Sequence, residues 1–468
     1  MPTELHKLTA CEAVDLLQRR ALSPSELIDA AAARIEAVDG AVNALPTLCL
    51  DRARAQADRL AAVAPLHGLP IAVKDLTDVA GVRTTLGSPI HADRVPDSSG
   101  VVVEVLEARG ANVIAKANTP EFGAGANTFN EVFGATRNPW DTRKTCGGSS
   151  GGSAVALATG QVALATGSDY GGSLRIPASF CGIVGFRPGP GCVAHGPGAL
   201  PFQTQAVDGP MARNVADAAL MLDAMVGQHR RDPISRPAPA KSYRAAVATP
   251  SAPKRIAWSP DLGIAPVDPE VRDICAEAAG WFARDGADVS EACFDLSDAR
   301  DMFRTLRAAQ FAAGYTALLE NHRDQLKPEV IWNIETGLKL TGAAVCQAEA
   351  ARGALFHRVS AFFDDHDLLL CPVVMTPPFD VEIRYLSEFG GVAFENYVDW
   401  LMMTFALSLT GCPSLSLPCG FTGDGLPVGL QILGPPHGEA GILSAAALYE
   451  AAHDFAARTP MDPVVRHI

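Results

Sequence analysis

The stretch CGGSSGGSAVALATGQVALATGSDYGGSLRIPASFCG, residues 146–182, contains two glycine-serine clusters separated by small and apolar residues. It contains no histidine, the usual base beside a serine nucleophile. A flexible linker is disfavoured because the first cluster runs directly into AVALATG, a small-residue helix that is stable only when buried. The segment therefore belongs to a folded core, and its serines need a chemical explanation.

Two other loop motifs fit the first cluster poorly. A phosphate-binding Walker loop requires a lysine after its last glycine, and GGSSGGSA has none. Residues 148–152 match G-x-S-x-G with Ser150 as nucleophile, but the polar stretch NPWDTRKTC stands where such an elbow needs a strand. His195 is the nearest downstream candidate for a general base, and a loop histidine more often has no catalytic role. Both motifs stay open as minor alternatives.

The composition is that of a globular enzyme. The chain has 468 residues, 48% of them hydrophobic and 19% charged, which is enough for a large core. Its net charge of −14 would repel phosphate groups, so no nucleic-acid partner is expected. The N-terminus lacks a signal-peptide core and no window reaches about eighteen apolar residues, so we expect a cytoplasmic protein without a membrane segment.

The eleven cysteines form no CxxC pair, and their number is odd. Neither a disulfide framework nor a zinc site follows from them, so we expect buried small side chains in a reducing compartment. No metal and no organic cofactor is expected.

Strand and helix patterns alternate along the chain. Ser23, Pro24 and Glu26 form a helix start, and Gly40 is placed to end that helix. The stretches GLPIAVKDLTDVAG and GANVIAKANT predict strands on either side of a helical GVVVEVLEARG. This alternation predicts an α/β fold, with a large twisted mixed sheet and helices on both faces.

No composition shift is sharp enough to divide the chain, so we expect one domain over residues 1–468. The stretches HDLLLCPV, PSLSLPCGF and VGLQILG are too apolar to stand alone, so they should rejoin the first sheet, and 440–456 should close the chain as a helix. The expected parts are N-terminal helices over 1–65, a core over 66–228, a variable region over 229–300, which begins the helical stretch 269–360, and pocket-wall helices with returning strands over 301–468.

The segment 146–187 resembles the signature segment of the amidase signature family of serine hydrolases. GLPIAVKDLTDVAGVRTTLGS, ANTPEFGAGANTFNEVFGATRNPWD and LTGCPSLSLPCGFTGDGLPVGLQILG resemble further stretches of that family. The resemblance covers most of the chain outside 230–300. It implies a Ser-Ser-Lys triad in place of a histidine-based one, with Ser173 as nucleophile, Ser149 as bridging serine after a cis peptide bond, and Lys74 as base.

The chemistry of that triad follows from the residue types. A lysine accepts a proton only when its amine is neutral, and the apolar run before Lys74 would carry it into the interior, where desolvation lowers its pKa. The alternative is a structural lysine paired with Asp75 or Asp78. A hydroxyl both accepts and donates, so Ser149 can pass the proton of Ser173 to Lys74 and later deliver it to the leaving amine.

The second cluster supplies the other half of the site. The glycines of SDYGGS let successive N–H groups point at one place, as an oxyanion hole requires. We expect its donors to be the amides of Tyr170, Gly171, Gly172 and Ser173. The resemblance implies that Ser150, Asp169 and Arg175 support the loop, and that the acyl group of the substrate is contacted by Gly123, Gly125, Asn127 and Cys146.

These observations predict an amidase that hydrolyses a C–N bond through an acyl-serine intermediate. The expected substrate is a small uncharged or aryl amide, a carbamate or a linear oligoamide, and no arginine is assigned to a substrate carboxylate. An esterase on the same scaffold and an amidotransferase-type subunit of a larger complex are the alternatives. The resemblance also implies a homodimer.

Overall fold

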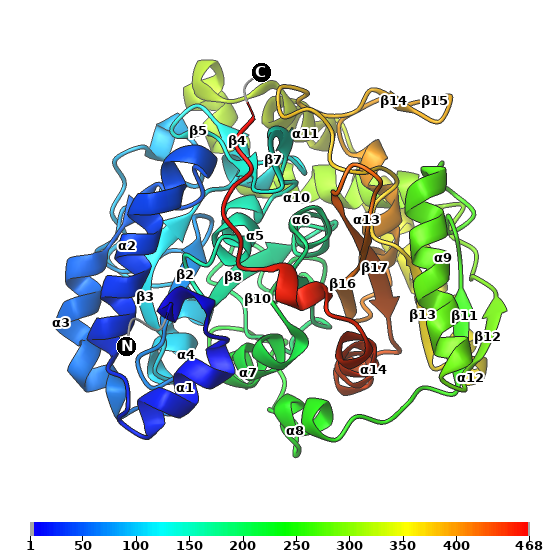
Figure 1. Ribbon diagram of the computed structural model, residues 1–468. Coiled ribbons are helices and arrows are strands. Elements are labelled where there is room, and N and C mark those ends of the chain that lie inside the picture. The colour runs from blue at the N-terminus through cyan, green and yellow to red at the C-terminus, as the bar shows by residue number, and fades with distance from the viewer. Residues whose placement is uncertain (1–3, 467–468) are drawn as a thin grey trace.

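The computed structural model describes residues 4–466, and its centre is one large twisted sheet (Figure 1). Within the described residues the sheet has eleven strands in the order β1-β3-β2-β8-β10-β9-β16-β17-β13-β11-β12. Parallel pairs lie near both ends and antiparallel pairs in the middle, so the predicted mixed α/β sheet is confirmed. In chain order the strands are β1 (Thr47–Leu48), β2 (Pro70–Lys74), β3 (Asn112–Ala117), β8 (Leu164–Asp169), β9 (Val184–Arg187), β10 (Val207–Ala212), β11 (Arg255–Trp258), β12 (Asp288–Glu291), β13 (Leu368–Pro372), β16 (Ser414–Phe421) and β17 (Pro427–Leu433).

Helices cover both faces because successive strand residues point to opposite sides of the sheet. In β13, Leu368 and Leu370 pack into one hydrophobic cluster, while Leu369 and Cys371 pack into another. The first cluster includes residues of α1 (Ala10–Gln18), α4 (Val101–Ala108), α7 (Val215–Met225), α9 (Pro269–Arg284) and α14 (Glu439–Ala452). The opposite face carries α2 (Pro24–Val42), α3 (Leu50–Ala61), α5 (Gly151–Ala158), α6 (Arg175–Cys181), α10 (Ala299–His322), α11 (Pro328–Leu338), α12 (Gly342–Asp365) and α13 (Met402–Leu409).

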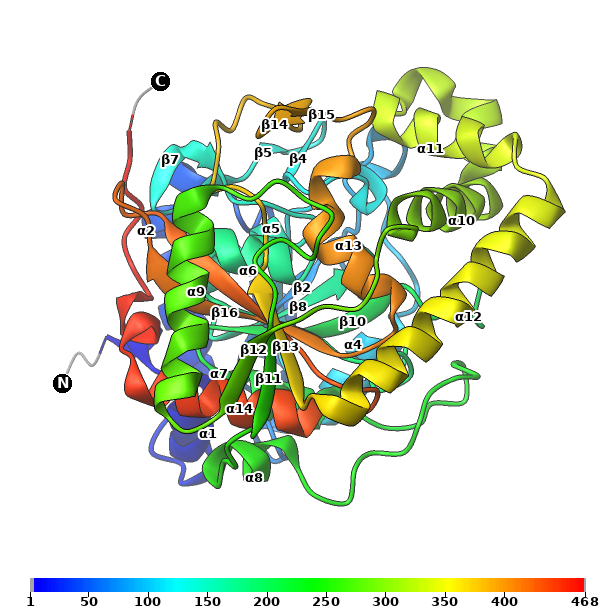
Figure 2. The same ribbon diagram turned by 90° about the vertical axis from the view of Figure 1, so that its right-hand side faces the viewer.

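The late strands return to the first sheet, as the sequence predicted. β16 pairs with β9 on one side and with β17 on the other, and β13 lies beside β17. The helices α10, α11 and α12 lie together on one side of the sheet (Figure 2). Of the three, α10 faces the loop after β8, where its Phe303 packs against Tyr170.

Three details differ from the sequence prediction. The helix that begins at Ser23 has the predicted capping box, but Gly40 does not end it. α2 continues to Val42, and Asn43 ends it in the left-handed conformation at φ 55°. The side-chain amide of Asn43 donates hydrogen bonds to the carbonyl oxygens of Phe133 and Ala135. Asparagine tolerates that conformation, so the helix needs no glycine there.

The stretch 269–360 is not one helical region. After α9, Gly286 at φ +102° turns the chain into β12, which extends the edge of the sheet before α10 begins. The polar stretch before the first serine cluster also contains a strand, β7 (Asp141–Thr145), which pairs with β6 (Arg137–Asn138) in a small separate sheet. Because β7 lies outside the main sheet, it does not create the strand-to-helix geometry of a nucleophile elbow.

Small two-stranded sheets and short helices complete the described chain. They include α8 (Tyr243–Ala248), β4 (Phe129–Asn130) with β5 (Gly134–Ala135), and β14 (Glu388–Phe389) with β15 (Val392–Ala393). No helix among residues 4–466 is long and apolar enough to cross a membrane.

Candidate active site

Lys74 ends β2 inside the protein, with 1% of its surface exposed. Its Nζ lies 2.7 Å from Ser149 Oγ and 3.0 Å from Ser168 Oγ, and it also donates to the carbonyl of Ser168. Burial lowers the pKa of Lys74 to about 7, although the charges of Asp169 and Asp208 act in the opposite direction. A substantial fraction of this amine is therefore neutral at physiological pH.

The structural alternative for Lys74 required an ion pair with Asp75 or Asp78. Asp75 instead pairs with Lys116 at 2.8 Å, and Asp78 pairs with Arg94. Lys74 forms no ion pair within residues 4–466, so hydroxyl and carbonyl oxygens are its partners. Lys74 therefore lacks the carboxylate partner that the structural alternative required.

Ser149 lies just before α5, and the peptide bond between Gly148 and Ser149 is cis. Glycines surround it because the start of α5 packs against the backbone of residues 118–128. A Cβ on Gly152 would lie 2.3 Å from the amide nitrogen of Asn118, and one on Gly123 would lie 3.4 Å from Ser149 Oγ. The glycine-rich sequence therefore brings Ser149 into close contact with both Lys74 and the loop at Gly123.

The second cluster forms the turn between β8 and α6. Gly172 has φ +130°, and a Cβ there would lie 2.3 Å from Thr404 Oγ1, so the position admits only glycine. Its amide donates to Asp169 Oδ1 at 2.8 Å. The amides of Tyr170, Gly171 and Ser173 donate to no acceptor among the described residues. Three of the four predicted oxyanion donors are therefore free.

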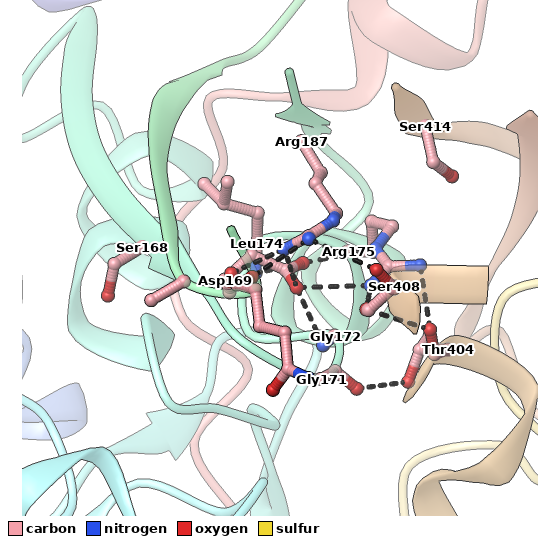
Figure 3. Close-up of polar contacts among 12 residues, drawn as sticks. Ser168, Asp169, Gly171, Gly172, Leu174, Arg175, Arg187, Thr404, Ser408 and Ser414 are labelled. Atoms are coloured by element: carbon pink, nitrogen blue, oxygen red, sulfur yellow. Dashed lines mark hydrogen bonds and ion pairs between the residues drawn. The ribbon is translucent and has the colours of Figure 1, made fainter. Parts of the chain in front are cut away.

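Asp169 fixes this turn through hydrogen bonds and ion pairs (Figure 3). Its carboxylate lies 3.0 Å from Arg175 and 3.1 Å from Arg187, and none of the three side chains is exposed to solvent. Burial alone would raise the pKa of Asp169, but the two guanidinium groups hold it well below its usual range. Asp169 also accepts the amide hydrogens of Gly172 and Leu174. The ionised carboxylate therefore sets the path of the backbone around Ser173.

A second layer of polar groups holds the arginines. Arg175 donates to Thr404 O, Ser408 Oγ and Gln431 Oε1. Thr404 and Ser408 are four residues apart on α13, so they face the same way along the helix (Figure 3). Thr404 Oγ1 also donates to Gly171 O at 2.7 Å. The sequence prediction missed these partners because they are more than two hundred residues away in the chain.

A cavity of about 390 Å³ opens above this turn. Ser149, Ser168 and Ser173 all line it, and Gly123 and Gly125 contribute to its edge. The hydrogen bonds of the described residues include none between the Ser149 and Ser173 hydroxyls. The apolar and aromatic part of the wall comes from Leu76, Phe122, Ile176, Phe303, Phe311, Tyr315, Val398 and Leu401.

Besides Lys74, Gly172 and Arg175, whose contacts are described above, three further predicted site residues lie outside the cavity lining. Ser150 is fully buried, and its hydroxyl contacts the backbone of Ser168. The side-chain amide of Asn127 donates to the carbonyls of Ile383 and Arg384. Cys146 is buried against Thr136 O. In the structure these side chains support the loops around the cavity.

His195 is more than an ordinary loop residue. It lines the cavity, and its Nδ1 lies 2.7 Å from Asp208 Oδ2 on β10. Burial lowers the pKa of His195, but the two carboxylates of Asp208 and Asp232 raise it above its usual value overall. No local pattern in the sequence indicates this pairing, because Asp208 reaches the site through the register of β10 with β8.

Among residues 4–466, no group of three or more His, Cys, Asp or Glu side chains is arranged to hold a metal ion. The chemistry available in the cavity is that of a buried lysine of low pKa, three serine hydroxyls and a turn with free backbone donors.

Comparison with known proteins identifies the family of the chain. The model of the family described as Amidase matches residues 26–443. The chain belongs to the amidase signature family. It is 36% identical over 471 residues to an acylamidase of Rhodococcus erythropolis, an alignment that covers 98% of each chain.

Two further relatives extend the comparison. One component of the glutamyl-tRNA(Gln) amidotransferase of Moorella thermoacetica is 35% identical over 492 residues, covering 98% of this chain and 99% of that protein. The crystal structure of a bacterial aryl acylamidase belonging to the amidase signature enzymes superimposes with a TM-score of 0.92 at 27% identity, covering 100% of both chains. This amidase signature protein is therefore a hydrolase of amide C–N bonds, as the sequence predicted.

Proposed function

We propose that this amidase cleaves small aryl or otherwise uncharged amides through an acyl-Ser173 intermediate, with Lys74 as base and Ser149 as proton relay. The observation that carries the proposal is the hydrogen bond of 2.7 Å between Lys74 Nζ and Ser149 Oγ, at the wall of a cavity that Ser173 also lines. A lysine whose pKa is about 7 can accept a proton near neutral pH.

In the acylation step, Ser173 Oγ forms a bond to the carbonyl carbon of the amide. Its proton passes to Ser149 Oγ, while the proton of Ser149 passes to Lys74 Nζ, so Ser149 stays neutral and Lys74 becomes an ammonium. The carbonyl oxygen becomes an oxyanion, which the free amides of Tyr170, Gly171 and Ser173 can bind. Each donor of this kind contributes about 2.7 to 4 kcal/mol to transition-state stabilisation.

The tetrahedral intermediate then loses the amine. The C–N bond breaks, and the amine leaves with a proton that Ser149 delivers and Lys74 replaces. Water next attacks the acyl-Ser173 ester and gives a proton through Ser149 to Lys74. The relay returns a proton to Ser173 Oγ as its bond to the acyl carbon breaks, which releases the acid and the free serine. An amine leaves only when protonated, which is why a relay that both accepts and donates suits an amidase.

The cavity wall supports an aryl or apolar substrate. Phe122, Phe303, Phe311 and Tyr315 contribute aromatic surface, and the cavity volume of about 390 Å³ suits a small molecule. The similarity to proteins named acylamidase and aryl acylamidase also favours an aryl or apolar amide. Carbamates and linear oligoamides remain within the proposed class.

The test is active-site labelling with a fluorophosphonate, followed by digestion and mass spectrometry. We expect the label on Ser173, and we expect Ser173→Ala to remove it while the protein keeps its thermal unfolding temperature. Label on Ser150 would overturn the assignment and favour the elbow motif. A folded wild-type protein that takes no label and hydrolyses no acetanilide would overturn the proposal.

A second candidate is a catalytic component of a larger complex, favoured by the 35% identity to the glutamyl-tRNA(Gln) amidotransferase component. Hydrolysis of acetanilide by the purified chain on its own distinguishes the two, because a dependent component is nearly inert without its partners. The molar mass of the same sample in solution tests the homodimer that the family resemblance implied.

A further inference from the structure

Arg307 places a guanidinium group in the wall of the cavity. It lies on α10, one turn after Phe303, and both residues line the cavity. Arg307 is 7% exposed. A side chain this buried normally has a charged partner, because an isolated ion is costly to remove from water.

The structure gives Arg307 no such partner within residues 4–466. Its Nε and Nη2 both donate to Tyr397 Oη, at 3.1 and 2.9 Å, and these are its hydrogen bonds in the described chain. The arginine one turn earlier, Arg304, pairs with Asp399 and Glu395. The buried Arg175 and Arg187 share Asp169. Arg307 is therefore a buried cation held by a neutral hydroxyl.

The other two cationic side chains that line the cavity, those of His195 and Arg231, each pair with a carboxylate. His195 pairs with Asp208, and Arg231 pairs with Glu104. The lining carboxylate of Asp232 accepts the amide hydrogens of His195 and Ile234. Of the three cations that line the cavity, Arg307 alone has no carboxylate partner among the described residues.

The free edge of Arg307 has the geometry of a carboxylate site. A guanidinium has five N–H donors, and Tyr397 Oη takes one from Nε and one from Nη2. Both hydrogens on Nη1 and one on Nη2 remain. One hydrogen of each of these two nitrogens forms the end-on fork that binds two carboxylate oxygens. A neutral carbonyl would use only part of this fork.

Aromatic rings hold the guanidinium in place. Its carbon lies 4.6 Å from the ring centre of Phe311, 5.3 Å from that of Tyr170 and 5.8 Å from that of Tyr397. Tyr170 is also the first residue of the proposed oxyanion turn, and it lines the same cavity as Arg307 and Ser173. A substrate held in this cavity can therefore contact both Arg307 and Ser173.

We propose that Arg307 binds a free carboxylate carried by the amide substrate, so that the preferred substrates are amides bearing a carboxylate on the acyl or the amine side. This inference rests on the proposed function and changes its substrate class, because both the sequence prediction and the proposed function gave an uncharged amide with no arginine assigned to a carboxylate. The rest of the cavity, largely apolar and aromatic, then contacts the remainder of the molecule.

The experiment compares two matched substrate pairs. N-glutaryl-4-nitroanilide and its terminal carboxamide place the charge on the acyl side, and 4-acetamidobenzoate and 4-acetamidobenzamide place it on the amine side. We expect kcat/KM for the carboxylate to exceed that of the carboxamide by about tenfold or more in one pair, as a charged hydrogen bond would give. In Arg307→Gln that ratio should fall to about one.

Arg300→Gln is the matched control, because Arg300 lies on the same helix outside the cavity lining and should keep the wild-type ratio. With the wild-type enzyme, a kcat/KM ratio of carboxylate to carboxamide of about one in both substrate pairs would overturn the inference. A preference for the carboxylate that is unchanged in Arg307→Gln would also overturn it. If Arg307→Gln does not fold, the wild-type enzyme still decides, since the carboxylate-bearing product of the preferred pair, glutarate or 4-aminobenzoate, should inhibit it about tenfold better than the matching carboxamide, glutaramate or 4-aminobenzamide. Absence of hydrolysis for all four substrates would instead reject the proposed function.

Discussion

Two buried lysines on neighbouring strands have opposite surroundings. Lys116 on β3 lies 2.8 Å from Asp75 and 2.7 Å from Thr84 Oγ1, and it is fully buried. Lys74 on β2 is equally buried but has only hydroxyl and carbonyl partners. Burial lowers the pKa of both lysines. The pKa of Lys116 is lowered overall although the adjacent carboxylate of Asp75 acts in the opposite direction, and at Lys74 the opposing charges of Asp169 and Asp208 act without a direct ion pair. The comparison teaches that burial is common to both lysines, whereas a direct carboxylate partner is present only at Lys116, which is why we propose only Lys74 as a base.

The largest expected effect is that of Lys74→Met on catalysis. Methionine fills a similar volume without a proton acceptor, so the protein should fold and kcat/KM for acetanilide should fall by about 10² to 10⁴-fold. Steady-state kinetics and thermal unfolding of the same sample give both quantities. A wild-type rate in a folded Lys74→Met protein would show that the two lysines do not differ in function.

Lys116→Met should affect stability instead. It leaves the buried carboxylate of Asp75 without its cation, which we expect to lower the free energy of unfolding by about 3 to 5 kcal/mol. Urea unfolding measures this loss. In the double variant Lys116→Met/Asp75→Leu most of the stability should return, because no unpaired charge remains. Equal losses of activity per folded molecule in Lys116→Met and Lys74→Met would contradict the comparison.

The smallest expected effect is the response of the rate to pH. Protonated Lys74 cannot accept a proton, so kcat/KM should fall about tenfold for each unit below a pKa of about 7 and level off above it. Rate measurements between pH 5 and pH 9 give the profile. A maximum at acidic pH would mean that the neutral form of Lys74 is not the active one.

The pKa of Lys74 should also affect the free energy of unfolding, which is measured independently of activity. The folded-state pKa of Lys74 is lowered from its ordinary 10.5 to about 7, so between these values the unfolded chain binds more protons than the folded one. Stability should therefore rise with pH across that window, by up to about 1.4 kcal/mol per unit from this group, and Lys74→Met should lack that contribution.

Much of the fold could be predicted from local sequence. The apolar run before Lys74, the capping box at Ser23 and the small-residue helix after Ser149 each carry their own signal, and each forms as expected. The prediction of a helix end was wrong where a contact with a residue distant in the sequence outweighed the local preference. Asn43 ends α2 because its side chain binds the carbonyls of Phe133 and Ala135, a contact that no pattern within the helix indicates.

The sequence by itself determined the glycine turns, the small-residue helix after Ser149 and the apolar strand before Lys74, because their signals are local. That the two glycine-serine clusters and Lys74 form one site was implied by the family resemblance. Tertiary structure alone decided which lysine or arginine pairs with which carboxylate. Asp75 turns to Lys116 and Asp78 to Arg94, Asp169 is held between Arg175 and Arg187, and Arg307 faces the cavity without a carboxylate. The physical reason is that ion pairing depends on distances of a few ångströms between residues that are often far apart in the chain.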